Sequence, residues 1–266
     1  MAIKIIILGG GDLASGVALR LSRLGCKLIV TELAQPYAVR RTVSFAQAVY
    51  DGSITIEGVN GCFFPSYEEI VFENCIPVLV DPDVSVVNKF NPDVLVDARM
   101  IKQGIPSCCY PEYFTIGLGP GFYAGKNCHA VIETQRGHYM GRVIYDGEAE
   151  PDTGIPERVA NFQHERVLRS PSEGIFHTEL EIGNIVEESE EVGRVDTDPI
   201  IAPFNGLIRG LLHNGLEVKA GIKIGDIDPR MDSKLIRLVS DKALAVGGGV
   251  VEAILSQPAY RKMLSE

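Results

Sequence analysis

The chain has 266 residues, and its 25 Lys and Arg against 35 Asp and Glu give a formal net charge of −10. This acid excess argues against a general nucleic-acid or anionic-membrane binder, because such partners need a basic face. With 45% hydrophobic and 23% charged residues the composition is globular, and the length fits one large domain or two modest ones. No charged leader with an apolar core precedes the first apolar run, so we expect a cytoplasmic protein.

The six cysteines stand at 26, 62, 75, 108, 109 and 128, and none forms a C-x-x-C pair. Reduced thiols are therefore expected, rather than a disulfide framework or zinc ribbon. Cys108, Cys109, Cys128 and His129 could meet as soft-metal ligands, but their spacing matches no metal template. Buried or incidental residues are the simpler interpretation, and no metal site is predicted.

The first half alternates strands and helices. Ile3–Leu8 is a β-branched apolar run suited to a strand buried on both faces, and Lys27–Thr31 reads as the second strand. Between them, apolar residues recur at helical spacing from Leu13 to Leu24. Further strands are expected over Ile76–Asp81, Asp93–Asp97, Tyr113–Leu118 and His129–Thr134, and helices over Arg40–Tyr50 and Val84–Phe90. This alternation predicts an α/β, Rossmann-like domain with a mostly parallel sheet over residues 1–160, with Asp146–Pro156 as the linker.

The second half contains an internal repeat with a constant offset of 32 residues. Gly174 matches Gly206, and Gly193 matches Gly225. Two such units are each too small to hide their own apolar face, so they should pack together with pseudo-twofold symmetry. Short strands and turn residues predict a smaller all-β domain over 165–235. A C-terminal helical segment follows over 240–266, where Gly247–Gly249 implies either a break or a closely packed backbone.

Within the repeat, Ala202–Gly206 and Val218–Gly221 resemble the Ala-Pro-x-x-Gly and Val-x-x-Gly motifs of the biotinyl/lipoyl carriers. This resemblance implies a barrel-sandwich hybrid fold. The carriers place a modified lysine in the hairpin between the two halves, whereas Val195–Pro199 has none. The resemblance is therefore used for the fold alone, and no swinging-arm role is expected.

The first chemical signal is a glycine turn between the first strand and its helix, carrying Gly9, Gly11 and Gly16. Glycine lets a phosphate approach the backbone, and the helix N-terminus adds partial positive charge. Glu32 follows Gly11 by about twenty residues, at the end of the second strand, where an acid can bind the ribose hydroxyls of a dinucleotide. The alternative is a scaffold that uses this turn for packing.

Other residues complete the predicted cofactor site. Asp12 would repel a phosphate, or else favour the helix as an N-terminal acid. Arg40 and Arg41 could bind phosphate, or form a solvated face. The second glycine cluster, with Gly117, Gly119 and Gly121, could form an anion-binding nest or an ordinary turn. No catalytic residue is assigned.

The chain resembles, over nearly its whole length, accessory proteins of the bacterial selenium-dependent molybdenum hydroxylase system. The strings that carry this resemblance are Gly9–Ala18, Thr31–Pro36, Arg40–Phe45 and Ile116–Phe122. Those accessory proteins look like distant relatives of the xanthine and carbon monoxide dehydrogenase maturation factors. The resemblance implies a maturation factor that handles a molybdopterin dinucleotide, or another dinucleotide, for insertion into a hydroxylase apoprotein, alone or with other maturation factors. Whether it catalyses a reaction or forms a homo-oligomer stays open. The alternatives are an NAD(P)-dependent oxidoreductase and a non-enzymatic scaffold with a vestigial site.

Overall fold

The computed structural model describes residues 2–101, 112–154, 159 and 162–265. The chain forms two compact units. The first comprises Met1–Pro36, Ser44–Thr153 and Val239–Glu266, and the second comprises Tyr37–Val43 and Gly154–Leu238. The first unit is therefore built from three separate stretches of chain.

A nine-stranded sheet forms the centre of the first unit, in the order β10-β9-β7-β6-β1-β2-β5-β4-β3. Every neighbouring pair from β9 to β4 is parallel, and only the two outer pairs, β9 with β10 and β4 with β3, are antiparallel. The strands are β1 Lys4–Leu8, β2 Lys27–Glu32, β3 Ser53–Ile56, β4 Val59–Phe64, β5 Ile76–Val80, β6 Val94–Asp97, β7 Phe114–Leu118, β9 Ala130–Ile132 and β10 Val143–Ile144. The separate pair β8 (Tyr123–Ala124) and β11 (Gly147–Glu148) is antiparallel.

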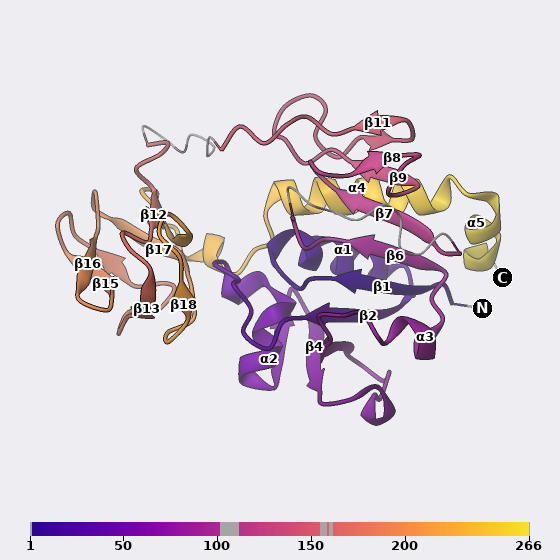
Figure 1. Ribbon diagram of the computed structural model, residues 1–266, viewed down its shortest axis with the longest axis horizontal. Coiled ribbons are helices and arrows are strands. Elements are labelled where there is room, and N and C mark those ends of the chain that lie inside the picture. The colour runs from indigo at the N-terminus through magenta and orange to yellow at the C-terminus, as the bar shows by residue number, and fades with distance from the viewer. Residues whose placement is uncertain (1, 102–111, 155–158, 160–161, 266) are drawn as a thin grey trace. The chain divides into compact units, whose positions relative to one another are not determined.

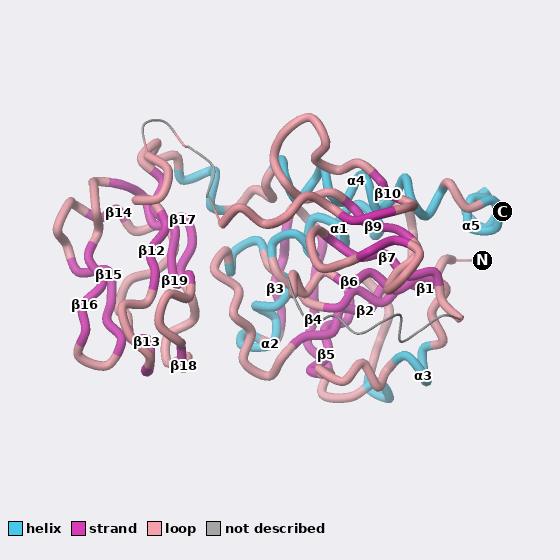
Figure 2. The backbone as a smooth tube through the Cα atoms, turned by 45° about the horizontal axis from the view of Figure 1, so that its top comes forward, coloured by secondary structure: helices cyan, strands magenta, loops and turns pink. Residues whose placement is uncertain are grey.

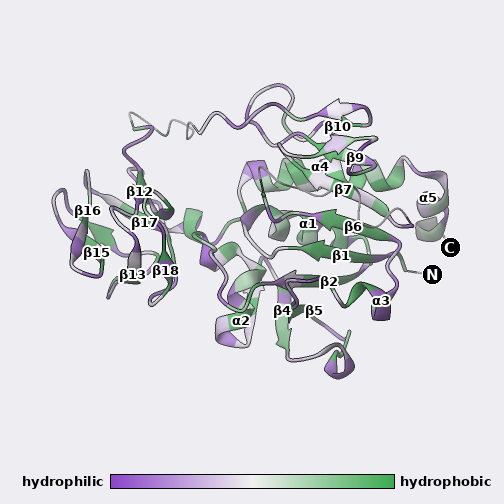
Figure 3. Ribbon diagram, viewed as in Figure 1, coloured by the Kyte–Doolittle hydropathy of each residue, from purple (hydrophilic) through white to green (hydrophobic). Residues whose placement is uncertain are grey.

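The central strands are buried on both faces. Ile5, Ile6 and Ile7 of β1 are fully buried, as the continuous β-branched run predicts. Ile6 packs in a cluster that includes Val87 and Phe90. Figure 3 colours β1 and β6 as hydrophobic, in keeping with a sheet covered on both sides.

The helices of the first unit are α1 Asp12–Arg23, α2 Ala48–Asp51, α3 Val87–Phe90, α4 Asp241–Leu255 and α5 Pro258–Ser265, with 3-10 turns η2 Phe45–Gln47 and η3 Tyr67–Glu69. Helices α1 and α4 lie side by side (Figure 1). A Cβ on Gly16 would lie 2.5 Å from the Ala243 carbonyl oxygen, and one on Gly247 would lie 2.7 Å from that of Gly16. The three glycines of α4 therefore do not break the helix, and Gly247 lets the backbones approach.

Two expectations from the sequence are wrong here. Residues 40–50 do not form one helix, because Ser44 is extended and separates η1 (Arg41–Val43) from η2. The proposed linker is partly built into the first unit: Gly147 and Glu148 pair with β8, and Ala149 is buried in a cluster with Phe122. Its end, at 155–156, lies outside the described residues.

The second unit consists of two four-stranded antiparallel sheets, ordered β12-β19-β17-β14 and β16-β15-β13-β18. The strands are β12 Val167–Arg169, β13 Gly174–His177, β14 Ile185–Val186, β15 Glu191–Val195, β16 Asp198–Ile201, β17 Gly206–Leu211, β18 Glu217–Val218 and β19 Lys223–Asp228, and a 3-10 turn η4 spans Ser233–Ile236. Figure 2 shows β13, β15 and β16 running next to one another.

The strand orders of the two sheets follow the pseudo-twofold symmetry expected from the repeat. Adding 32 to the residue numbers of β12, β13, β14 and β15 gives the positions of β16, β17, β18 and β19. Replacing each strand by its counterpart in this way converts the order of one sheet into the order of the other. The match extends to single residues, since Ile185 pairs with Leu207 and, in the equivalent place, Glu217 pairs with Ile175. Each sheet therefore contains two strands from each half, and the two halves share one core.

Altogether the protein is mixed α/β, with a large mixed sheet, smaller antiparallel sheets and C-terminal helices. Among the helices of the described chain, none has the length and apolar character needed to cross a membrane.

Candidate ligand site at the carboxyl edge of the large sheet

The candidate site begins at the turn that leaves β1. Strand β1 lies between β2 and β6, so the chain leaves β1 toward one side of the sheet and later returns on the other. In open α/β sheets, ligands bind outside the carboxyl ends of the strands at such a reversal. Gly9–Gly11 occupies this position and leads directly into α1.

The start of α1 lies at this edge of the sheet. The Ser15 N–H donates to the Gly11 carbonyl, so the N–H groups of Leu13 and Ala14 precede the first bond of the helix. Such groups, together with the helix dipole, attract anions. Asp12 is the first helical residue, and its carboxylate competes for the same positive end.

The glycines of the turn have different structural roles. Gly9 has a φ of +86°, and its Cβ would lie 3.2 Å from the Arg99 Cα. A Cβ on Gly10 would lie 2.7 Å from the Ala46 nitrogen. A Cβ on Gly11, by contrast, meets no atom within 4 Å, and its φ of −68° is open to any residue. Packing thus requires Gly9, Gly10 and Gly16, whereas Gly11 leaves space beside the helix start.

Glu32 lies directly beside the turn, as its spacing predicts. Its carboxylate accepts hydrogen bonds from the Gly10 N–H at 2.7 Å and the Leu33 N–H at 2.8 Å. Burial raises the pKa of the Glu32 carboxyl, and the two N–H bonds offset part of that effect. A carboxylate has about four acceptor positions, so two remain for hydroxyl groups of a ligand.

Two side chains that the sequence analysis did not select lie at the end of β6. Arg99 contacts the Asp97 carboxylate, with its Nε 3.0 Å from one oxygen and a terminal nitrogen 2.5 Å from the other. Asp97 pairs in register with Leu8 of β1, so both residues flank the glycine turn. The rule that points to Glu32, a polar residue just after a strand, would also have found them.

The second glycine cluster follows β7 at the same edge. Gly117 packs against the Phe122 ring, and a Cβ on Gly119 would lie 2.5 Å from the Thr134 hydroxyl. Gly121 has a φ of +98°. Nearby, the buried Glu133 carboxylate accepts backbone N–H bonds after β9. Packing and turn geometry therefore account for these three glycines without a ligand.

Arg40 and Arg41 belong to the second unit. Arg40 is buried and donates to the Leu235 and Leu238 carbonyls at 3.0 and 2.9 Å. Arg41 donates to the Leu211 carbonyl at 2.8 Å and contacts the Glu181 carboxylate at 3.2 Å. These guanidinium groups fasten Tyr37–Val43 within the second unit, so the sequence expectation that they share a phosphate site with Glu32 gains no support.

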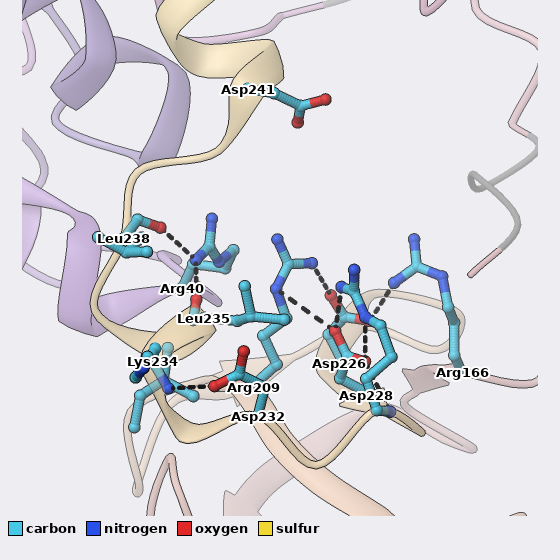
Figure 4. Close-up of polar contacts among 12 residues, drawn as sticks. Arg40, Arg166, Arg209, Asp226, Asp228, Asp232, Lys234, Leu235, Leu238 and Asp241 are labelled. Carbon is cyan, nitrogen blue, oxygen red and sulfur yellow. Dashed lines mark hydrogen bonds and ion pairs between the residues drawn. The ribbon is translucent and has the colours of Figure 1, made fainter. Parts of the chain in front are cut away.

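The second unit also holds a cluster of charged side chains that the sequence did not reveal. Asp226 is buried and contacts both Arg166 and Arg209, which point toward it in Figure 4. Asp228 is buried beside Arg230, with a 2.6 Å ion pair. All these groups are paired with one another, which is typical of a structural ion-pair network.

The cysteines selected from the sequence do not form a metal site among the described residues. Cys108 and Cys109 lie outside the described residues, and Cys128 is buried. Within the ranges that the structure describes, no three His, Cys, Asp or Glu side chains gather closely enough to hold a metal ion.

Comparison with known proteins finds a sequence relative in Escherichia coli K12. The chain is 46% identical over 254 residues to YqeB of Escherichia coli K12, named an uncharacterized protein. The match covers 94% of this chain and 47% of that protein, so the chain spans about half the length of its relative. No family model matches.

Similar solved structures are distant. An aspartoacylase family protein from Mesorhizobium loti is 14% identical with a TM-score of 0.28, over 85% of each chain. A succinylglutamate desuccinylase/aspartoacylase from Rhodobacter sphaeroides is 15% identical with a TM-score of 0.26, also over 85% of each. At such scores these likenesses transfer no activity to this chain.

These findings overturn the functional expectations from the sequence. The named neighbours are aspartoacylase or desuccinylase proteins and YqeB, and none is a molybdenum hydroxylase maturation factor or an NAD(P)-dependent oxidoreductase. The resemblance to the selenium-dependent hydroxylase accessory proteins is therefore wrong as a guide to function. It rested on four strings of residues, two of which contain the glycine turns, and on the repeat that follows them.

Proposed function

We propose that the first unit is a Rossmann-like domain that binds a nucleotide with a diphosphate and a free ribose diol at the carboxyl edge of its sheet. Six of its parallel strands follow the order β5-β2-β1-β6-β7-β9. Numbered along the chain, this is the 3-2-1-4-5-6 order of doubly wound dinucleotide-binding sheets. We likewise infer that the interlocked sheets of the second unit form a barrel-sandwich arrangement.

Gly11 carries the proposal. Its neighbours in the turn are glycine because a Cβ would strike other backbone atoms, but Gly11 faces open space with an ordinary φ. A side chain there would block only what approaches the first N–H groups of α1. A phosphate fits this place, because it needs close access to the backbone at a helix N-terminus.

The environment of Glu32 supports a ligand with a free ribose diol. Both its carboxylate oxygens already accept one N–H bond, and each keeps a further acceptor position close to the turn. A ribose hydroxyl can donate to such an oxygen, whereas a phosphate on the same ribose would meet a like charge. The proposed ligand class therefore has an unmodified diol.

Calorimetric titration with ADP-ribose tests this function. Gly11→Val should weaken binding by about ten- to hundredfold with an unchanged melting temperature, since one charge-assisted contact contributes about 1.5–3 kcal/mol. Gly248→Val in α4 is the matched control, because a Cβ there also meets no atom within 4 Å. A 2′-phosphorylated ADP-ribose should bind more weakly than ADP-ribose.

Equal binding by the native protein and Gly11→Val would remove the turn from the site. If the native protein binds no ADP-ribose at millimolar concentration, the proposal fails. Tighter binding of the 2′-phosphorylated form would contradict the role of Glu32.

A further inference from the structure

The chain passes directly over the glycine turn as it leaves β6. The Ala98 N–H donates to the Leu8 carbonyl at 2.9 Å, so the backbone continues alongside the end of β1. A Cβ on Gly9 would lie 3.2 Å from the Cα of Arg99 and 3.3 Å from its nitrogen. Met100 then has a φ of +58°, in the left-handed region that residues with a side chain rarely adopt. The backbone of Arg99 is therefore held against the glycine turn.

The Asp97 carboxylate fixes the side chain of Arg99. One oxygen accepts a hydrogen bond from the Arg99 Nε at 3.0 Å and from its backbone N–H at 3.2 Å, and the other accepts from a terminal nitrogen at 2.5 Å. Two parallel bonds of this kind hold a guanidinium in one plane. Only 15% of the Asp97 side chain is exposed, against 36% of that of Arg99. Asp97 thus positions the arginine, and the arginine is the one that solvent reaches.

The charges at this edge make a fixed guanidinium significant. Asp12 begins α1, Glu32 ends β2 and Asp97 ends β6, so carboxylates surround the glycine turn. The positive end of α1 attracts an anion only at close range, because the effect falls off within the first turn of a helix. A second phosphate of the same ligand lies further from the helix and would meet these carboxylates. It needs a positive group of its own.

Arg99 has the chemistry and the position to be that group. A guanidinium carries five N–H donors in a planar fork that matches phosphate oxygens, and the two bonds to Asp97 set the direction of this fork. Arg99 follows β6 and the glycine turn follows β1, so the two lie on adjacent strands at the switch point of the sheet. A diphosphate that crosses this point would contact both.

We propose that Arg99, positioned by Asp97, binds the second phosphate of the ligand and makes the site select nucleoside diphosphates and their esters over nucleoside monophosphates. This inference rests on the proposed function, because it places the first phosphate at Gly11 and the ribose diol at Glu32. A monophosphate would use only those two places. A diphosphate gains one more charge-assisted contact, which sets its preference.

The test is calorimetric titration of the full chain with AMP and with ADP. The native protein should bind ADP about tenfold or more tightly than AMP, as one charge-assisted contact gives. Arg99→Gln should remove this preference by weakening ADP and leaving AMP unchanged. Arg99→Lys keeps the charge but loses the planar fork, so it should retain part of the preference. Asp97→Asn should also weaken ADP more than AMP, since it frees the fork to turn.

Arg23→Gln is the matched control for the arginine variants. Arg23 is also partly exposed and pairs with a carboxylate, that of Glu57 at 3.4 Å, but it lies at the opposite end of α1. It should keep the native preference for ADP. Arg99→Gln removes only a partly exposed ion pair, so its melting temperature should stay close to that of the native protein.

The outcomes separate this inference from the proposed function. A preference for ADP that Arg99→Gln retains in full, or no preference in the native protein, would overturn the role of Arg99 even where Gly11→Val still weakens ADP-ribose. An equal loss of AMP and ADP binding in Arg99→Gln would assign Arg99 to the shape of the turn, and would also overturn it. If the native protein binds neither AMP, ADP nor ADP-ribose at millimolar concentration, the proposed function fails and this inference fails with it.

Discussion

The two halves of the repeat share a backbone but differ in their charged residues. Arg194 of the first half is exposed, whereas Asp226, at the equivalent position of the second half, is buried. His177 of the first half is likewise exposed, whereas its counterpart Arg209 is mostly buried. The Leu211 N–H of the second half donates to the Val39 carbonyl of the segment Tyr37–Val43, whereas the described chain gives the equivalent Glu179 N–H no such bond. The repeated glycine and apolar positions thus specify the strands, while the charged positions differ between the two halves.

Removing a buried carboxylate from the second half of the repeat should have the largest effect on the stability of the protein. Asp226→Ala leaves Arg166 and Arg209 buried without their shared carboxylate, and the free energy of unfolding should fall by about 3–5 kcal/mol. Its counterpart, Arg194→Ala, removes an exposed ion pair and should cost about 0–1 kcal/mol. Urea titration followed by circular dichroism measures both. Equal losses would show that the halves do not differ in this way.

Replacing a residue of the second half by its counterpart from the first half tests the packing of the segment Tyr37–Val43. Gly210→Thr places the residue of the first half beneath Val39, where a Cβ would lie 2.8 Å from the Val39 Cγ1. We expect a loss of about 1–3 kcal/mol from overpacking, measured as a lower melting temperature. Gly248→Val, a substitution at an open glycine, serves as the control. An unchanged melting temperature for Gly210→Thr would mean that Val39 does not pack there.

Low pH should reduce the stability of the second half of the repeat through the carboxyl group of Asp228. Burial alone would raise the pKa of this carboxyl, but the hydrogen bonds and charge of Arg230 outweigh burial and hold the pKa below its usual value. A lowered folded-state pKa contributes stability above the unfolded value, and this stability is lost as the pH falls below about 4. The native protein should therefore lose stability in that range, and Asp228→Asn should lose less. Parallel pH profiles for the two proteins would refute this role.

The smallest expected effect concerns Arg41. Arg41→Ala removes one bond to the Leu211 carbonyl and a partly exposed ion pair, at a cost of about 1 kcal/mol. Because its guanidinium is engaged in the second unit, binding of ADP-ribose should not change. A calorimetric titration that shows weaker ADP-ribose binding in this variant would return Arg41 to the nucleotide site.

Local signals in the sequence predicted the strands well but not the long-range partners. The β-branched runs predicted β1, β2 and β5, and the 32-residue offset predicted the pseudo-twofold packing that the strand orders of the second unit follow. Glu32 was placed beside the turn because both follow adjacent strands. The sequence did not predict the bond from Arg41 to Leu211, because the two residues are far apart along the chain and no local pattern encodes such a contact.

Two other failures have physical reasons. The apolar spacing of residues 40–50 suggested a helix, but the Ala46 N–H bonds the Gly10 carbonyl and the Phe45 N–H bonds the Ser15 hydroxyl, so tertiary contacts override the propensity. The hairpin β3–β4 was not predicted, although Glu57 and Gly58 at its turn both have positive φ. A two-residue turn of this kind between alternating residues is a recognisable hairpin signal.

The close approach of Gly16 and Gly247 has a consequence for the order of events during synthesis. Helix α4 is translated after the whole second unit, yet it supplies the surface against which α1 packs. The strands of the repeat can pair as soon as residues up to 228 have left the ribosome, since their partners are close in the chain. The large sheet, begun first, must wait with one side of α1 uncovered until α4 emerges.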